Sequence, residues 1–260
     1  MILRRVMEHV RRQDWFAVFL DFVIVVAGVF VGIQVANWNA ALATDRQSKS
    51  VTARLLADLR DEAWSYRLLV EYSGDVLANA ERALAALEGR LARNDEALLV
   101  AAYRATQYRE PRRRRSTYDE LISTGAIGLI RDRALRDTAV RVYTTPMFDN
   151  IAREGAGSRY REAFRMTVPV EVQRALRNSC GDHDIRVGDY KVIVDSLDYP
   201  CTTGLPPAVL TEAADGLRAN TALTALLRLR IADIETRRAD MIANNPDIRD
   251  GLGAIAGEAP

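Results

Sequence analysis

The chain has 260 residues, and its 36 basic and 35 acidic residues leave a formal net charge of +1. This balance provides no global field that would attract nucleic acid, so we expect no nucleic-acid partner. Apolar residues make up 48% of the chain and aromatic residues only 7%, a composition that favours a mostly α protein with a sizeable core.

The first 14 residues predict a short cytoplasmic segment at a membrane surface. Apolar side chains recur with helical spacing on one face, and arginines lie largely opposite them. An amphipathic helix of this kind binds anionic lipid through its basic face. We therefore expect membrane lipid to be the partner of residues 1–14.

Residues 15–39 predict a transmembrane helix. The 21 residues from 16 to 36 contain only two polar side chains, Asp21 and Gln34. At about 1.5 Å per residue this run is roughly 31 Å long, close to the ~30 Å hydrocarbon thickness of a bilayer. Trp15 and Trp38 flank the run, where indole rings favour the two membrane–water interfaces. The alternative, a buried core helix, rarely requires such a long apolar run between two tryptophans.

One face of this helix carries small and acidic residues. Gly28, Gly32 and Ala36 are spaced by four, which allows close approach of a second helix backbone, and Asp21 lies two turns before Gly28. A carboxyl group facing lipid is costly, so we favour a contact between this face and a partner helix. The alternative is that Asp21 reaches headgroup water.

Flanking charges predict the orientation. Four arginines precede the apolar run, whereas residues 37–52 carry only Arg46 and Lys49. The positive-inside rule then places the N-terminus in the cytoplasm and the bulk of the chain in the periplasm of a bacterial inner membrane. Cleavage as a signal peptide is the alternative, because residues 41–43 read Ala-Leu-Ala, but the apolar run exceeds the about 7–15 residues of a signal core.

Beyond the membrane, the chain predicts a long continuing helix that ends near Gly89. The heptad positions a of this helix are assigned to Leu56, Ala63, Val70, Leu77, Leu84 and Leu91. The positions d are assigned to Leu59, Tyr66, Ser73, Ala80 and Leu87. Small and polar residues in this stripe disfavour a leucine zipper, so we expect it to pack within its own domain, with a second copy as the alternative.

Residues 40–250 predict an exported helical domain, and residues 251–260 a frayed tail. Asn94 and Asp132 are expected to cap helices, capping boxes begin at Ser116 and Thr117, and Gly125 ends the helix that they open. A further helix is expected from Pro146 through Phe164, weakened by two glycines, and a strongly apolar one over residues 221–243. The only strand-like run, residues 190–194, predicts a hairpin with residues 185–187.

Cys180 and Cys201 are the only cysteines, and in an oxidising compartment they predict one disulfide that closes a small loop. The alternative is two unrelated thiols. Asp182, His183, Asp184 and Asp189 lie in this loop and could gather around a divalent ion, but Asp and Gly are also ordinary turn residues. We therefore expect no metal and no cofactor.

Four consecutive arginines, Arg112, Arg113, Arg114 and Arg115, follow Pro111. A cationic cluster of this kind is a candidate contact for phosphate or lipid headgroups, with a solvated loop as the more common alternative.

Two stretches together resemble an uncharacterised bacterial family of single-pass membrane proteins. The first is Asp21 with residues 24–39, which end in Asn-Trp-Asn, and the second is residues 116–143. In the second stretch the resemblance rests on Tyr118, Glu120, Leu121, Ser123 and Gly125. The sequence departs from the family pattern at Asp21, where glutamate is expected, and at Ala36, where asparagine is usual. The resemblance implies membrane residence and no known activity.

The sequence predicts no catalytic residues. It contains two histidines, one of them in the N-terminal segment, and no nucleotide-binding or zinc-protease motif. The leading hypothesis is a non-enzymatic membrane-anchored interaction or scaffold protein, partnered by a second copy or by another membrane protein. The alternative is an extracytoplasmic sensor or ligand-binding module that acts through a partner.

Overall fold

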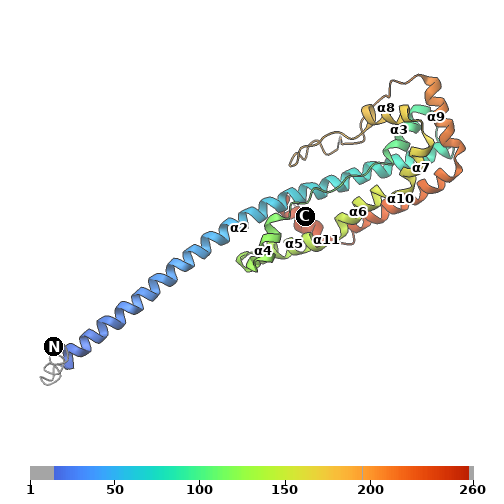
Figure 1. Ribbon diagram of the computed structural model, residues 1–260. Helices are drawn as coiled ribbons and strands as arrows, with labels where there is room; N and C mark the ends of the chain where they lie inside the picture. The colour runs from blue at the N-terminus through green and yellow to red at the C-terminus, as the bar shows by residue number, and fades with distance from the viewer. Residues whose placement is uncertain (1–14, 195, 258–260) are drawn as a thin grey trace. The chain divides into compact units, whose positions relative to one another are not determined.

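The computed structural model describes residues 15–194 and 196–257, and all of the regular structure within them is helical. The helices are α2 (Trp15–Leu87), α3 (Asp95–Arg104), α4 (Ser116–Ser123), the 3-10 helix η1 (Ala126–Leu129), α5 (Arg133–Thr144), α6 (Met147–Ala156), α7 (Arg159–Thr167), α8 (Val170–Cys180), α9 (Pro207–Ala219), α10 (Thr221–Ile242) and α11 (Pro246–Ala256) (Figure 1). The predicted mostly α class is confirmed.

The chain divides into two compact units, Met1–Thr52 and Ala53–Pro260. The boundary comes later than the expected one after residue 39, because the helix α2 has no break there. Residues 1–14, expected as an interfacial segment, lie outside the described residues. The predicted end of the long helix is confirmed: α2 ends at Leu87, and Gly89 follows with φ +70°, a conformation that glycine adopts at little cost.

Within the second unit, α2 buries one stripe against other helices of the same unit. The predicted d positions Leu59, Tyr66 and Ala80 are buried. Of the predicted a row only Ala63 is buried, and the row that is buried throughout lies one residue earlier: Leu55, Glu62, Leu69, Val76 and Ala83. The pattern was misleading because a glutamate occupies a core position, where sequence reasoning expects an apolar side chain.

The main core lies where α3, α7, α8, α9 and α10 meet the C-terminal end of α2. Helix α10 runs beside α6 and α7, and α9 packs on α3 (Figure 1). The fully buried side chains of this core include Ala80, Leu99, Tyr160, Phe164, Leu176, Leu217 and Leu227. Each large apolar side chain buried in this way contributes about 1.5–3 kcal/mol, so this cluster is the main source of stability.

Helix starts agree with the predicted caps at Asn94 and Asp132, and Asn220 caps α10 in the same way without having been predicted. The side chains of Asn94, Asp132 and Asn220 accept hydrogen bonds from the backbone N–H groups three residues later. The helix expected from Pro146 through Phe164 is instead two helices, because Gly157 ends α6 and Ser158 caps α7. The expected capping boxes of α4 do not form, and Asp58 of α2 accepts the Thr117 N–H at 3.3 Å.

Two further expectations are corrected. Residues 185–194 form turns and no strand, because Ile193 packs against Trp64 and Leu68 of α2 and the Trp64 indole donates to the Asp189 carbonyl at 3.1 Å. The tail is not frayed from residue 251. Helix α11 continues to Ala256, because its Leu252 is buried where α11 packs on α5.

We predict opposite effects of alanine at two helical glycines. A Cβ at Gly155 of α6 would lie 2.3 Å from the Cβ of Tyr108, so Gly155→Ala should lower the free energy of unfolding by about 1–3 kcal/mol. Gly253 of α11 has no atom within 4 Å of such a Cβ, so Gly253→Ala should raise it by about 0.5–1 kcal/mol. Urea unfolding of the full chain in detergent micelles, followed by circular dichroism, measures both. Equal effects of the two substitutions would contradict the close approach of Tyr108.

Candidate functional site

The first unit exposes the predicted membrane segment completely. Every side chain of residues 15–39 is exposed, including Trp15 at 73% and Trp38 at 66%. Among the described residues, α2 is the one helix with a stretch long and apolar enough to cross a membrane. This surface finds no cover within its own unit, which agrees with a helix surrounded by lipid.

The small residues of this helix leave room for a partner. Asp21, Gly28, Gly32 and Ala36 all lie within the unbroken helix α2, where their spacings place them on one face. Within the first unit, a Cβ added at Gly28 or Gly32 would meet nothing within 4 Å beyond the neighbouring backbone of its own helix. The face is therefore open along its length.

The four predicted anion-contact arginines have different surroundings. Arg112 is exposed. Arg113 forms an ion pair with Glu62 of α2 at 2.9 Å, Arg114 with Asp61 at 3.3 Å, and Arg115 with Asp119 at 3.0 Å. Three of the four guanidinium groups thus contact carboxylates of their own unit.

The Glu62 carboxylate is the centre of this contact. Its side chain is only 1% exposed, and besides Arg113 it accepts the backbone N–H of Arg114 at 2.6 Å. Burial raises the pKa of the Glu62 carboxyl, and the positive charge of Arg113 opposes that rise. The Arg113 guanidinium also lies over the Phe148 ring, 4.4 Å from its centroid. Charge pairing and ring contacts together hold the segment before α4 on α2.

Residues that carry the family resemblance form further contacts between α4 and its neighbouring helices. Glu120 accepts two hydrogen bonds from Arg54 of α2, at 2.8 and 3.0 Å. Tyr118 stacks on Tyr143 with ring centroids 4.9 Å apart. Gly125 has φ +68° between α4 and η1, a conformation that favours glycine. These residues therefore join α2, α4 and α5.

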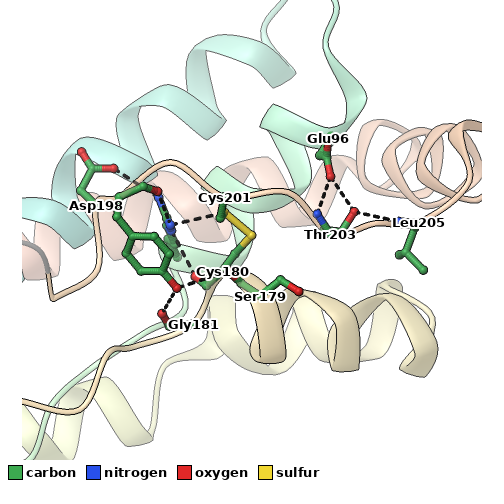
Figure 2. The surroundings of a disulfide bond; sticks show 10 residues. Glu96, Ser179, Cys180, Gly181, Asp198, Cys201, Thr203 and Leu205 are labelled. Atoms are coloured by element: carbon green, nitrogen blue, oxygen red, sulfur yellow. Dashed lines mark hydrogen bonds and ion pairs between the residues drawn. A yellow bond between two sulfur atoms is a disulfide. The ribbon is translucent and has the colours of Figure 1, made fainter.

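The predicted disulfide between Cys180 and Cys201 is present, and Figure 2 shows its surroundings. The buried Arg104 of α3 donates to the carbonyls of Cys180 and Tyr199, at 3.2 and 2.8 Å. On the other side, Glu96 accepts the backbone N–H and the hydroxyl of Thr203, at 2.7 and 2.6 Å (Figure 2). The ends of the disulfide loop are thus tied to α3 by polar contacts.

Two of the candidate metal ligands in the loop, Asp182 and His183, contact different tyrosines. Asp182 accepts the Tyr72 hydroxyl at 2.8 Å, and the His183 ring stacks on Tyr199 with centroids 3.8 Å apart. In the part of the chain that the structure describes, no three His, Cys, Asp or Glu side chains form a group that could hold a metal ion.

Two carboxyl groups, that of Asp75 and that of Asp198 in the disulfide loop, lie close together. The Asp75 carboxyl of α2 has one buried oxygen without a hydrogen-bond partner. Burial, followed by the charges of Asp198 and Glu71, raises the pKa of Asp75 to about 6. This carboxyl is therefore poised to take up a proton in mildly acidic solution.

One cationic site escaped the sequence reasoning. A cleft of about 590 Å³ is lined by Arg161 and Arg165 of α7, by Arg174 and Arg177 of α8, and by Tyr103 and Asp182. We call it the arginine cleft. The sequence does indicate this site. Two arginines lie four residues apart in α7 and two lie three apart in α8, which places each pair on one face of its helix. A search for consecutive arginines finds residues 112–115 instead.

We predict that adjacent acidic residues of α2 differ strongly in importance. Glu62→Ala leaves Arg113 half-buried without its partner, so it should lower the free energy of unfolding by about 3–5 kcal/mol. Asp61→Ala removes only the exposed pair with Arg114 and should cost about 0–1 kcal/mol. Urea unfolding of both full-length variants makes the comparison, and similar midpoints would show that the buried pair does not stabilise the unit.

We also predict a pH-dependent contribution from Asp75. Its pKa is higher in the folded chain than in the unfolded one, so its contribution to stability is complete below about pH 4 and is lost as the pH rises through about 6. Asp75→Asn should remove this slope and raise the free energy of unfolding at pH 7.5 by about 1 kcal/mol after solvent screening. Unfolding midpoints at pH 4.5 and 7.5 test it, with the exposed Asp184→Asn as control. A slope in Asp75→Asn as steep as that of the wild type would exclude this carboxyl as a contributor.

Comparison of the chain with protein-family models, with curated proteins and with solved structures finds no match. The resemblance to a family of single-pass membrane proteins therefore stays a prediction.

Proposed function

We propose that this chain is a membrane-anchored, non-enzymatic interaction protein. The observation that carries the proposal is the uninterrupted exposed apolar surface of α2 between Trp15 and Trp38. Its length matches a bilayer, and both flanking indoles are available for the interfaces. The anchor holds the helical unit Ala53–Pro260 at a bacterial inner membrane.

The interaction uses the face formed by Asp21, Gly28, Gly32 and Ala36. Small residues let two helix backbones approach, and a partner helix spares Asp21 the cost of facing hydrocarbon. The open space at both glycines supports this role, because no part of the chain's own unit fills it. The partner is a second copy of the chain or another membrane protein.

The proposed orientation places the N-terminus in the cytoplasm and the helical unit in the periplasm. The arginines that precede the membrane segment support it. The disulfide between Cys180 and Cys201 also supports it, since such bonds persist in oxidising compartments.

We predict that Gly28→Leu combined with Gly32→Leu abolishes association in a membrane two-hybrid assay, because the leucine side chains keep the backbones apart. The matched control is Val26→Leu with Phe30→Leu, which alters the opposite face of the same helix and should leave association intact. Cross-linking in cells, followed by mass spectrometry, identifies whether the partner is a second copy. Unchanged association of the glycine double variant would overturn the proposed face.

A further inference from the structure

The arginine cleft contains an excess of positive charge. Four guanidinium groups line it against a single carboxylate, that of Asp182. This carboxylate already accepts a hydrogen bond from Tyr72. The cleft therefore presents a net charge of about +3 to any molecule that enters it.

Many other arginines of the same unit are paired with carboxylates. Arg54, Arg113 and Arg237 each form an ion pair with a glutamate, at distances of 2.6–2.9 Å. Among the described residues, by contrast, no carboxylate forms an ion pair with any of the four cleft arginines. Like charges gathered in one cleft repel each other, and an anion bound between them would relieve that repulsion.

Arg161 is held in place before any ligand arrives. Its guanidinium donates to the Thr106 carbonyl at 3.0 Å and lies over the Tyr108 ring, 4.9 Å from the centroid. Burial, and then the charge of Arg165, lower the pKa of Arg161, as expected where two cations line one cleft. Preorganised charge of this kind reduces the entropy that a ligand must overcome.

The two helices of the cleft are also fixed relative to each other. Gln173 of α8 donates to the carbonyls of Arg165 and Val168 at the end of α7, at 2.9 and 2.7 Å. The buried rings of Tyr103 and Phe164 also line the cleft, with centroids 6.3 Å apart. The lining therefore combines these two aromatic rings with a larger set of polar and charged side chains, which suits a charged ligand better than an apolar one.

We propose that the arginine cleft binds a phosphate-bearing ligand with at least two negative charges. Guanidinium groups match phosphate oxygens in bidentate geometry, and two pairs of them from two successive helices suit two phosphate groups better than one. A volume of about 590 Å³ accommodates an inorganic diphosphate or a small organic one. This site uses no residue of the membrane segment, so it goes beyond the proposed association and does not depend on it.

The test is titration calorimetry with inorganic pyrophosphate on the full chain in phosphatidylcholine nanodiscs. Arg165→Gln with Arg174→Gln removes one exposed guanidinium from each helix and should weaken pyrophosphate binding at least about tenfold, because charged hydrogen bonds are lost. Arg165→Lys with Arg174→Lys keeps the positive charge but not the planar guanidinium group. Its affinity for pyrophosphate should lie between those of the wild type and the glutamine variant.

The matched control is Arg159→Gln with Arg186→Gln, which removes the same charge from two exposed positions outside the cleft and should bind as the wild type does. Circular dichroism checks that all variants keep their helical content. An equal loss in the control would overturn the site, because the attraction would then follow net charge alone.

A second arm distinguishes a soluble phosphate from a lipid headgroup. The same nanodiscs are mixed with separate vesicles of phosphatidylcholine containing phosphatidylglycerol, and vesicle binding is measured by flotation. Vesicle binding that the Arg165→Gln/Arg174→Gln variant loses, and that pyrophosphate displaces, supports the phosphate site with lipid as its source. Absence of binding to both pyrophosphate and the vesicles would overturn the proposal.

Discussion

The second unit depends on the burial of one stripe of α2. Helices α3 to α11 have short amphipathic faces, and a long helix offers them a common surface on which to exclude water. The stripe from Leu55 to Ala83 follows a spacing of about 3.5 residues, so it stays on one side of the helix over about eight turns. The end of the stripe, Ala80 and Ala83, enters the main core, and Glu62 holds the segment before α4.

Polar groups within the stripe decide which segment docks where. A purely apolar stripe would accept any amphipathic helix, whereas Glu62 accepts only a segment that supplies a guanidinium and a backbone N–H together. Residues 113–114 supply both. The desolvation of Glu62 is costly, and its partners offset that cost at a single register, which we regard as the source of a unique arrangement.

Local chemistry explains what could be predicted from the sequence. Caps at Asn94 and Asp132, the helix end before Gly89 and the disulfide each depend on a few neighbouring residues or on a unique pair, so they are readable without the fold. The heptad row, the hairpin and the tail depend on distant partners. Glu62 is a core residue only because Arg113 reaches it, and residues 190–194 form no strand because α2 offers Ile193 a better surface. Membrane association and ligand binding involve molecules outside the chain.

The arginines show how charge must be interpreted in three dimensions. Four consecutive arginines at 112–115 form a strong signal in the sequence, yet three of them contact carboxylates that the fold brings to them. Arg161, Arg165, Arg174 and Arg177 are diluted among other residues, yet the junction of α7 and α8 gathers them in one cleft. Charge density along the chain measures how many cations are near in sequence, whereas binding depends on cations that are near in space and have no internal partner. A cluster without ion pairs, in a fold that pairs many of its arginines with carboxylates, is therefore better evidence for an anionic ligand than a run of the same size in which three of four arginines are already paired.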